Sequence, residues 1–455
     1  MFRFDLTQIA VKVGGKLIGA DVDAFDLVIE NIAIDSRIVE QGDLFVAIKG
    51  ENHDGADYIP QAVACGAAAV IAEAKSDISV PQIVVDDSWK ALAALGNMAR
   101  ESSEASFVAV TGSNGKTTVK EMIKVILSEV APTLATQGNL NNEIGVPLTL
   151  FALGQEHKYA VIEMGASKNG DIKYLTQIAR PDISVVTNAS AAHLQGFGGL
   201  EGVAKTKGEI FESLPEEGTA IINADDEFAG YWKDVSGSEN IITFGKCQTA
   251  DVRLGKIDDS GAEIETPNGE LLLNLKLPGM HNINNAMTAT AVAIALNIPL
   301  PTIKSALEKM GSVKGRLCFQ KANAGGTVID DSYNANPASL QAGLQVLSEQ
   351  DGEKWLLLGD MAELGDDTEL FHAQAAQTAH ELGVTRLFAC GANSEILVEN
   401  FGVGAQAYQD VNFLINDLNK DLIKGITLLV KGSRMMKLDQ VVNGISVKSN
   451  NGGKR

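Results

Sequence analysis

The residues best suited to chemistry in this sequence form a loop between an apolar segment and a helical one. Residues 107–110 are apolar and predict a short buried strand, and residues 119–130 predict a helix. The loop between them reads TGSNGKTT. Glycines let backbone N–H groups close around phosphate oxygens, and a helix N-terminus adds a partial positive charge. The pattern predicts a phosphate-binding loop whose nucleotide contacts are Thr111, Gly112, Ser113, Asn114, Gly115, Lys116, Thr117 and Thr118.

Two side chains of this loop would act directly on a nucleotide. Lys116 would reach the terminal phosphates, and Thr117 would place its hydroxyl on Mg²⁺. The loop departs from the commonest pattern, because Val110 stands where a glycine is usual and Gly112 makes a tighter turn before Gly115. A glycine turn that binds nothing is the alternative, which the lysine, the threonine and the strand–helix frame disfavour.

Three further side chains follow expected strands or lie on an expected helix. Glu163 ends an apolar strand, where a buried unpaired carboxylate is unfavourable, so beside a nucleotide it would be a metal ligand. Its alternative is an edge carboxylate that accepts hydrogen bonds from the backbone. His193 lies in a loop after another strand, and the residues leave a site and a structural role equally open. Lys207 falls on a helix, where a solvated lysine is the ordinary interpretation.

Polar loops elsewhere suggest contacts with substrate. Asn139 and Asn142 belong to a loop with three amides beside a carboxylate, more than a turn requires, which favours a substrate contact. Asn282 and Asn285 would read a base edge or cap the Ala-rich helix that follows, and the cap is the favoured interpretation.

The first segment carries its own polar loops. Ser36 and Arg37, after an expected strand, could hold a phosphate or a sugar, and Lys49 begins a polar loop of the type that contacts ligand. Solvated loops and a surface ion pair are the favoured alternative.

The expected elements predict an α/β protein with three domains. Residues 1–85 form a small α/β domain, residues 86–313 a central domain and residues 314–455 a second α/β unit with its own sheet. The central domain is a doubly wound parallel sheet, whose ligands bind at the carboxyl ends of the strands. The polar strand ends of the last unit include Asp331, Asn334, Asn336 and Lys431, and Arg316 could reach back to a phosphate in the central domain.

Composition limits the class of protein. The chain has 455 residues and a formal net charge of −21, which argues against a partner that is nucleic acid. Its four cysteines have no metal-type spacing and predict free thiols in a reducing compartment. No secretory leader and no apolar run of about 18 residues is visible, so we expect no membrane insertion and a cytoplasmic location.

The chain resembles the ATP-dependent Mur ligases of peptidoglycan synthesis along nearly its whole length. The resemblance rests on TGSNGKTTVKEM, GNLNNEIGVPLTL, VIEMGA, AAHLQGFG with KGEIF, DDSYNANPAS, LGDMAELG and VKGSR, in that order. DDSYNANP and LGDMAELG are similar to the members that add D-alanyl-D-alanine. The resemblance implies a UDP-substrate domain, a central ATP-binding domain and a C-terminal Rossmann-like domain that receives the incoming D-Ala-D-Ala.

The resemblance also implies a reaction. The carboxylate of UDP-N-acetylmuramoyl-tripeptide attacks the γ-phosphate of ATP, and the amine of D-Ala-D-Ala then attacks the acyl phosphate, leaving an amide, ADP and phosphate. A sister ligase that adds a single amino acid to a shorter UDP-muramoyl peptide is the alternative. A nucleotide-dependent switch without chemistry is disfavoured by the charged groups at the strand ends.

Roles for individual residues follow from the resemblance. Lys116 would hold the β- and γ-phosphates, Thr117 and Glu163 would ligate one Mg²⁺, and His193 would ligate a second. Lys207 matches a lysine that is carbamoylated by CO₂ in relatives, which would make it an anionic metal partner and replaces the solvated interpretation.

The remaining implied contacts are with ligands. Asn282 and Asn285 would contact adenine, Asp331 would contact the ATP ribose, and Arg316 would contact a phosphate. The implied catalytic residues are Lys116, Lys207, His193 and Arg316. The uridine diphosphate would meet Ser36, Arg37 and Lys49, and the dipeptide would meet Asn334, Asn336 and Lys431. We expect the enzyme to act as a monomer on small-molecule substrates.

Overall fold

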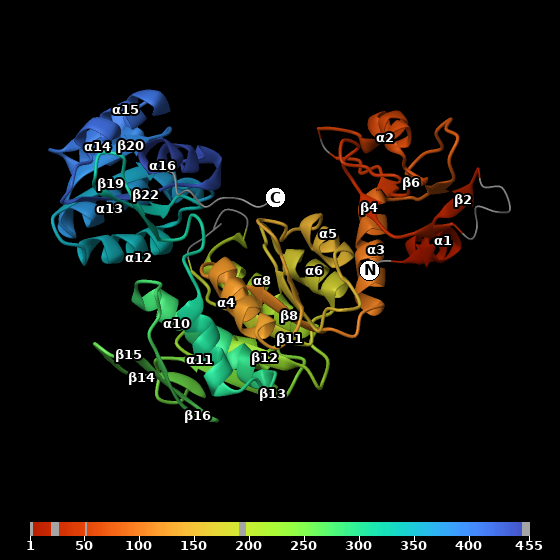
Figure 1. The fold of residues 1–455 in the computed structure, drawn as a ribbon, viewed down its shortest axis with the longest axis horizontal. Helices are drawn as coiled ribbons and strands as arrows, with labels where there is room; N and C mark the ends of the chain where they lie inside the picture. Colours follow the sequence, from red (N-terminus) through yellow and green to blue (C-terminus); the bar gives the residue numbers. More distant parts are fainter. Residues whose placement is uncertain (1–2, 20–26, 51, 191–196, 448–455) are drawn as a thin grey trace.

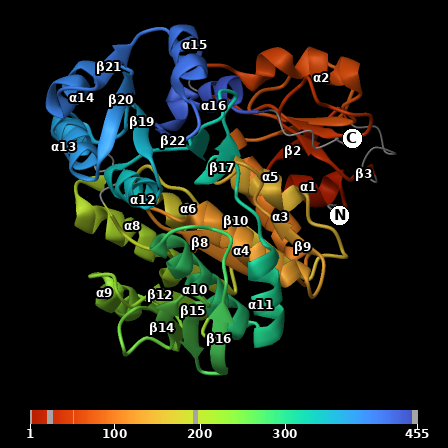
Figure 2. The ribbon, with the colours of Figure 1, turned by 60° about the vertical axis from the view of Figure 1, so that its left-hand side comes forward.

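Three sheets organise the molecule, each in its own α/β unit (Figure 1). The computed structural model describes residues 3–19, 27–50, 52–190 and 197–447. Figures 1 and 2 both place the first and the third unit along one edge of the central unit. The predicted fold class is confirmed, whereas the boundaries after residues 85 and 313 stay a prediction. No helix in the described part of the chain is long and apolar enough to cross a membrane.

The first unit holds a five-stranded sheet in the order β2-β7-β6-β5-β4, and a short antiparallel pair of β1 with β3. Its inner strands β5, β6 and β7 are parallel, and β5 and β6 are fully buried, as the apolar run Ala69–Ala72 favours. The elements are β1 Phe4–Asp5, α1 Leu6–Val13, β2 Lys16–Ile18, β3 Val28–Ile29, β4 Ile32–Ala33, β5 Leu44–Val46, the 3₁₀ turn η2 Gly55–Tyr58, α2 Ile59–Cys65, β6 Ala69–Ala72 and β7 Gln82–Val84.

The central unit is a nine-stranded sheet in the order β16-β15-β14-β13-β12-β11-β8-β10-β9. Its strands run parallel from β9 to β14, and β14, β15 and β16 continue as an antiparallel ribbon. The ribbon includes the hairpin of β15 with β16, which turns between Thr266 and Gly269. The elements are α3 Ser88–Glu101, β8 Ser106–Thr111, α4 Lys116–Ser128, β9 Thr133–Ala135, α5 Gly145–Phe151, β10 Tyr159–Glu163, α6 Asp171–Ala179, β11 Ile183–Val186, α8 Leu200–Glu212, β12 Thr219–Asn223, α9 Ala229–Asp234, β13 Asn240–Gly245, β14 Val252–Asp258, β15 Gly261–Thr266, β16 Gly269–Leu273, α10 Met280–Ala295 and α11 Leu300–Lys309.

The third unit is a six-stranded sheet in the order β17-β18-β22-β19-β20-β21, parallel except for the edge strand β17. Strands β18, β19, β20 and β22 contain apolar runs that are buried, whereas the edge strands β17 and β21 are only partly buried and contain no such run. The elements are β17 Cys318–Lys321, β18 Thr327–Asp331, α12 Pro337–Ser348, β19 Glu353–Gly359, the 3₁₀ turn η3 Gly365–Asp367, α13 Thr368–Glu381, β20 Val384–Cys390, α14 Ser394–Phe401, β21 Ala405–Tyr408, α15 Val411–Asp421, β22 Ile426–Lys431, the 3₁₀ turn η4 Arg434–Met436 and α16 Asp439–Ile445.

Helices cover both faces of the central sheet. One buried cluster joins the sheet to α3, α5, α6 and α8, and a second joins its other face to α4, α10 and α11. The first cluster also contains Leu6, Ile9 and Ala10 of α1, so one apolar core runs from the first unit into the central one. The third unit has its own clusters on the two faces of its sheet.

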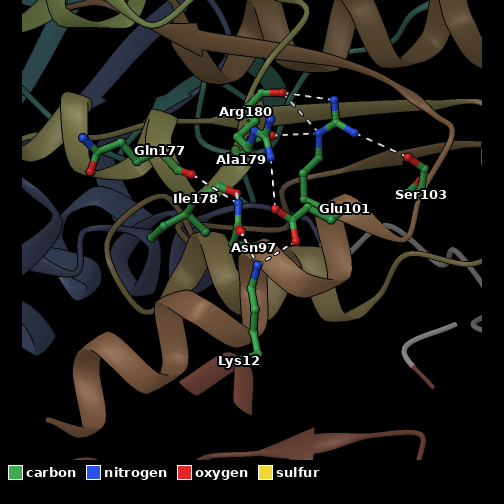
Figure 3. Close-up of polar contacts among 9 residues, drawn as sticks. Lys12, Asn97, Glu101, Ser103, Gln177, Ile178, Ala179 and Arg180 are labelled. Carbon is green, nitrogen blue, oxygen red and sulfur yellow. Dashed lines mark hydrogen bonds and ion pairs between the residues drawn. The ribbon is translucent and has the colours of Figure 1, made fainter. Parts of the chain in front are cut away.

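Helix α3 connects the first unit to the central one through side chains as well (Figure 3). Lys12 at the end of α1 donates to Asn97 at 2.9 Å and to Glu101 at 2.6 Å, both on α3. Arg180 after α6 donates to the other oxygen of Glu101 at 3.0 Å, and Arg100 donates to the carbonyl of Ala179 at 3.0 Å. The Lys12 ammonium lowers the pKa of Glu101 first of all, and Arg180 adds to this. Three helices are thereby fixed to each other.

Candidate active site

The phosphate loop leaves the carboxyl end of β8, in the middle of the central sheet, and leads into α4. Gly112 has φ +145° and Gly115 has φ +83°. A Cβ atom on Gly112 would lie 1.9 Å from Oγ1 of Thr187, and one on Gly115 would lie 2.6 Å from Oδ1 of Asn285. Both positions therefore require glycine, for their backbone conformation and for the close approach of their neighbours.

The loop that follows β11 holds the phosphate loop in place. The hydroxyl of Thr187 donates to the carbonyl of Asn114 at 2.6 Å, and the Asn188 side chain accepts from the Asn114 N–H at 3.1 Å. Ser113 Oγ donates to the carbonyl of Ser190 at 3.1 Å and accepts its N–H at 3.0 Å. The loop is thus fixed by its surroundings before any ligand arrives, which lowers the cost of binding.

The N-terminus of α4 is free to hold an anion. The helix begins at Lys116, earlier than the residue 119 that the apolar pattern indicates, and Gly115 supplies no capping side chain. The first backbone N–H groups of a helix have no partner within it, so they point toward whatever lies above the loop.

The Lys116 ammonium is folded back onto its own loop. Its Nζ donates to the carbonyl of Gly112 at 2.5 Å and to that of Ser113 at 3.3 Å. Loss of hydration lowers the pKa of Lys116, the Glu163 carboxylate opposes this, and the Arg316 guanidinium adds to it. A cation held by carbonyl oxygens alone gains much when a phosphate anion approaches.

Two cavities meet at this loop. The first, of about 280 Å³, runs from the loop to α10 and the start of α12. The second, of about 300 Å³, runs from the loop toward Glu163 and Lys207. Both are lined by Asn114, Gly115, Thr117, Arg316 and Ser339. A ligand with a phosphate on the loop can therefore extend one end into each cavity.

Two asparagines of α10 line the first cavity. They lie inside the helix, which begins at Met280 after Gly279, so the favoured interpretation that they cap a helix is wrong. Asn282 Nδ2 donates to the carbonyl of Pro278 at 2.7 Å, and Asn285 Nδ2 donates to Asn282 Oδ1 at 3.2 Å. Gly279 takes the cap position because its φ of +88° favours glycine, and packing of α10 on the sheet overrides the weak helix propensity of asparagine.

A buried ion pair from the third unit closes the other side of the first cavity. Lys431 Nζ at the end of β22 donates to Asp331 Oδ2 at 2.5 Å and to the carbonyl of Asn334 at 3.0 Å. Lys431 is 0% exposed and Asp331 is 6% exposed. Burial lowers the pKa of Lys431, and the Asp331 carboxylate opposes the shift. The structure places Lys431 on the first cavity, so its predicted contact with the dipeptide stays a prediction that the geometry does not favour.

A buried carboxylate with a free oxygen lies in the second cavity. Glu163 at the end of β10 is 2% exposed, and its Oε1 accepts from Asn141 Nδ2 at 2.9 Å. Its Oε2 is buried without a hydrogen-bond partner. An unpaired buried carboxylate oxygen beside Thr117 fits a hard cation. Among the described residues no three His, Cys, Asp or Glu side chains gather into a metal site, and Mg²⁺ on a nucleotide needs only one or two carboxylates with phosphate oxygens.

Lys207 is buried, so its interpretation as a solvated helix lysine is wrong. It lies on α8, is 2% exposed and lines the second cavity. Its Nζ stands 5.5 Å from the centre of the Phe197 ring. Loss of hydration, followed by the nearby Lys116 ammonium, lowers the pKa of Lys207 to about 7. A large fraction of this amine is therefore neutral and nucleophilic near neutral pH.

The third unit contributes two guanidinium groups stacked on one ring. The Cζ of Arg316 lies 4.3 Å from the centre of the Tyr333 ring, and that of Arg434 lies 5.4 Å from it. Arg316 Nε is buried without a partner. Burial raises the pKa of Tyr333, and the Glu163 carboxylate adds to the shift, so the phenol is neutral.

Where the structure describes the chain, one side-chain hydrogen bond joins the third unit to the phosphate loop. Asn336 caps α12, because its Oδ1 accepts from the Ser339 N–H at 2.8 Å. Its Nδ2 donates to Asn114 Oδ1 at 2.8 Å. Asn334 and Asn336 both line the second cavity, as their predicted role requires.

The predicted residues of the first unit lie elsewhere. Ser36 donates to Gln61 at 2.9 Å, and Arg37 pairs with Asp35 at 2.6 Å with 79% of its side chain exposed. Lys49 Nζ stands 3.9 Å from Glu73. Ser36, Arg37 and Lys49 line neither of the two cavities. Their role stays a prediction.

Other predicted residues have mixed outcomes. Asn139 and Asn142 line the second cavity, and Asn142 also accepts the Gly145 N–H at 2.9 Å at the start of α5. Thr111 is fully buried and donates to the carbonyl of Met164 at 2.8 Å, so it supports the loop from below. His193 lies outside the described residues.

Sequence reasoning gave no role to several residues that line these cavities. Asn141, the middle amide of its loop, is the one that holds Glu163. His281, Tyr333 and Arg434 also line the cavities, and the predicted roles in their motifs went to adjacent residues. The signal in the sequence for these residues was their position next to residues with a predicted role. The sequence does not show which side chain of a loop faces a cavity, because that depends on the backbone conformation of the loop.

Three family models match consecutive parts of the chain. They are the Mur ligase family catalytic domain at residues 28–118, the Mur ligase middle domain at 110–293 and the Mur ligase glutamate ligase domain at 315–434. The UDP-N-acetylmuramoyl-tripeptide--D-alanyl-D-alanine ligase of Escherichia coli (strain K12) is 41% identical over 452 residues, covering 98% of this chain and 99% of the relative.

Solved structures agree with this over the whole fold. A MurF crystal structure from Acinetobacter baumannii has 36% identity and a TM-score of 0.89, covering 97% of this chain and 98% of that one. The MurF ligase from Thermotoga maritima in complex with ADP has 29% identity and a TM-score of 0.81, covering 91% of this chain and 96% of that one. With three domain models in order and a relative this similar over nearly its full length, the chain belongs to the Mur ligase family.

Proposed function

We propose that this enzyme is the ATP-dependent ligase that adds D-alanyl-D-alanine to UDP-N-acetylmuramoyl-tripeptide in peptidoglycan precursor synthesis. The names of the relatives over the full chain support this substrate pair. The observation that carries the chemistry is the pair of cavities that meet at the phosphate loop, one toward α10 and the other toward Glu163 and Lys207.

The reaction needs ATP because a carboxylate is a poor acyl donor. Its oxygen leaves only after it has been phosphorylated. The tripeptide carboxylate attacks the γ-phosphorus of ATP, the bond from that phosphorus to the ADP oxygen breaks, and an acyl phosphate forms. The dipeptide amine then attacks the acyl carbon and loses a proton, and the C–O bond to phosphate breaks.

The first step brings two anions together, the tripeptide carboxylate and the ATP phosphates. Cations where the two cavities meet are therefore needed to neutralise their charge. Lys116 leaves its loop carbonyls for the β- and γ-phosphates, and the N-terminus of α4 adds backbone N–H groups. Arg316, with a free buried Nε and a place on both cavities, reaches the transferred phosphoryl group. Catalysis is then positioning together with charge stabilisation.

One Mg²⁺ would be held by protein oxygens that line the second cavity. The free Oε2 of Glu163 and the hydroxyl of Thr117 suit one ion, and His193 and Lys207 are assigned to a second. Bound there, Mg²⁺ neutralises phosphate charge and polarises phosphoryl oxygens.

Lys207 becomes an anionic metal partner by carbamoylation. The neutral amine attacks the carbon of CO₂, an N–C bond forms, and one proton leaves to solvent, so a cation is replaced by a carbamate anion. The pKa of about 7 supplies the neutral amine that this step needs.

The remaining roles follow from the cavities. The nucleoside of ATP occupies the first cavity, with Asn282 and Asn285 at the base and Asp331 at the ribose. The ADP complex of a structural relative supports nucleotide binding by this fold. Ser36, Arg37 and Lys49 are assigned to the uridine diphosphate, and Asn334 and Asn336 to the dipeptide. We also propose that the enzyme works as a monomer in the cytoplasm.

The function is tested by ATP-dependent phosphate release with UDP-N-acetylmuramoyl-tripeptide, with and without D-Ala-D-Ala. Release that requires both substrates is expected. Stimulation by a single amino acid on a shorter UDP-muramoyl peptide, without an effect of D-Ala-D-Ala, would instead identify a sister ligase.

The carbamate is tested by pH and by substitution. Because burial lowers the pKa of Lys207 to about 7, roughly a tenth of the amine is neutral at pH 6 and roughly nine tenths at pH 8. With ¹³C-labelled CO₂ held at a fixed dissolved concentration, a ¹³C NMR carbamate signal should rise between these values and be missing in Lys207→Ala. The variant should be largely inactive and partly restored by bicarbonate or a short carboxylic acid. Full activity without rescue would contradict the carbamate.

A further inference from the structure

Arg434 lies just beyond the carboxyl end of β22, in the third unit, on a backbone segment with buried neighbours. It follows β22, which ends at Lys431, and begins the 3₁₀ turn η4. Gly432 leaves no room for a side chain, because a Cβ there would lie 2.7 Å from Leu438. Ser433 is 3% exposed and donates its N–H to the carbonyl of Asp360 at 2.9 Å. The backbone that carries the guanidinium is therefore fixed by its buried neighbours.

The Arg434 guanidinium has no anionic partner in the described part of the chain. Within the described residues its side chain makes no hydrogen bond and no ion pair, and its recorded contact is the face of the Tyr333 ring at 5.4 Å. Arg386 of the same unit is engaged differently, since it pairs with Asp421 at 3.1 Å. A guanidinium that lies over an aromatic face keeps its N–H groups free for a planar anion at its edge.

Arg316 and Arg434 share Tyr333 but face different spaces. Arg316 lines both cavities, including the one assigned to the nucleoside, whereas Arg434 lines only the second cavity. The anion of Arg434 is therefore not on the nucleotide side. The reacting carboxylate lies near Lys116, at the phosphate loop, and has cations there already.

We propose that Arg434 binds the terminal carboxylate of the incoming D-alanyl-D-alanine, an inference that rests on the proposed function. That carboxylate does not react, it is the one permanent charge at the far end of the acceptor, and a planar guanidinium binds it in a bidentate manner. In a dipeptide it stands about 3.5 Å further from the amine than in a single amino acid, one residue of extended chain. A cation that lines the second cavity but lies outside the phosphate loop therefore selects a dipeptide, and Tyr333 orients the guanidinium.

The test compares two acceptors in three enzymes. The acceptors are D-Ala-D-Ala and D-alanyl-D-alaninamide, which has the same shape without the carboxylate charge. The enzymes are wild type, Arg434→Gln and Lys424→Gln. Lys424 is exposed and lies just before β22, at the opposite end of the same strand, so it controls for the loss of one positive charge from this unit.

The expected result is a rise of about 10- to 100-fold in KM for D-Ala-D-Ala in Arg434→Gln, the range of a charged hydrogen-bonded contact. Wild type should prefer the acid over the amide by a similar factor, and Arg434→Gln should use the two about equally. KM for ATP should stay within twofold. Trapping of the acyl phosphate with hydroxylamine, which needs no acceptor, should persist and show that the variant is folded.

Three outcomes would count against the proposal. If wild type responds to D-Ala-D-Ala and Arg434→Gln keeps both its KM and the preference for the acid, this inference fails while the proposed function stands. If Lys424→Gln raises KM for D-Ala-D-Ala as much, the rise comes from the loss of any positive charge in this unit, and the inference fails. If wild type does not respond to D-Ala-D-Ala at all, the proposed function fails and takes this inference with it.

Discussion

The first and the third unit are joined to the central unit in different ways. The first shares an apolar core with it, in which Leu6 and Ile9 of α1 are fully buried together with α3. The third has its own apolar clusters, whose described members are residues of that unit alone. Among the described residues, its joint to the centre includes the polar contacts of Asn336 on the phosphate loop and of Arg316 on both cavities, beside the side chain of Val346 close to Gly279.

This difference indicates which of the two outer units can move relative to the central unit when substrate binds. Apolar burial does not depend on ligand, so the first unit and α3 are held firmly to the centre. Polar groups around ligand cavities gain most of their free energy only when anions are bound between them. We therefore expect substrate to draw the third unit onto the phosphate loop, as lids and domains close in other enzymes.

The largest effect should come from Lys116→Ala. Phosphate release should fall by about 1,000-fold or more, because a cation at the transferred phosphoryl group supplies several kcal/mol of transition-state stabilisation. The free energy of unfolding, measured in urea, should change little, since the hydrogen bonds of the Lys116 ammonium within the described residues go to carbonyls of its own loop. Near-native turnover would remove the phosphate loop from the mechanism.

The next effect tests the apolar joint. Ile9→Ala should lower the free energy of unfolding by about 2–5 kcal/mol, the usual result of truncating a fully buried aliphatic side chain. Val11→Ala on the same helix is the matched control, because Val11 is 78% exposed and should change stability by less than about 0.5 kcal/mol. Equal effects of the two substitutions would mean that α1 is not part of a shared core.

The smallest effect tests the polar joint. Asn336→Ala removes both the cap of α12 and the bond to Asn114, and should cost about 1 kcal/mol of stability. Asn336→Ser keeps a capping hydroxyl on a side chain too short to reach Asn114. It should keep nearly native stability while kcat/KM for ATP falls by about threefold to tenfold, the value of one hydrogen bond. Native kinetics in Asn336→Ser would show that the bond plays no part in joining the units.

The sequence was most informative where one residue type is physically required. The loop TGSNGKTT predicted a strand, a glycine turn and a helix, and the structure shows that Gly112 and Gly115 are both crowded by side chains from other elements. Long apolar runs predicted the inner strands, and they failed at edge strands such as β17, where only alternate residues are covered. The helix start at Met280 was missed because asparagines are ambiguous between a cap and a helix interior.

By itself the sequence determined the fold class, the phosphate loop and, through its motifs, the family, since these depend on residue types at fixed short spacings. Only the tertiary structure decided burial and facing. It showed that Lys207 is buried rather than solvated, that Asn141 holds Glu163, and that Lys431 is locked to Asp331. Such facts depend on residues tens to hundreds of positions apart. The sequence also cannot show that Arg434 has no ion-pair partner among the described residues, because that depends on which carboxylates the fold brings near it.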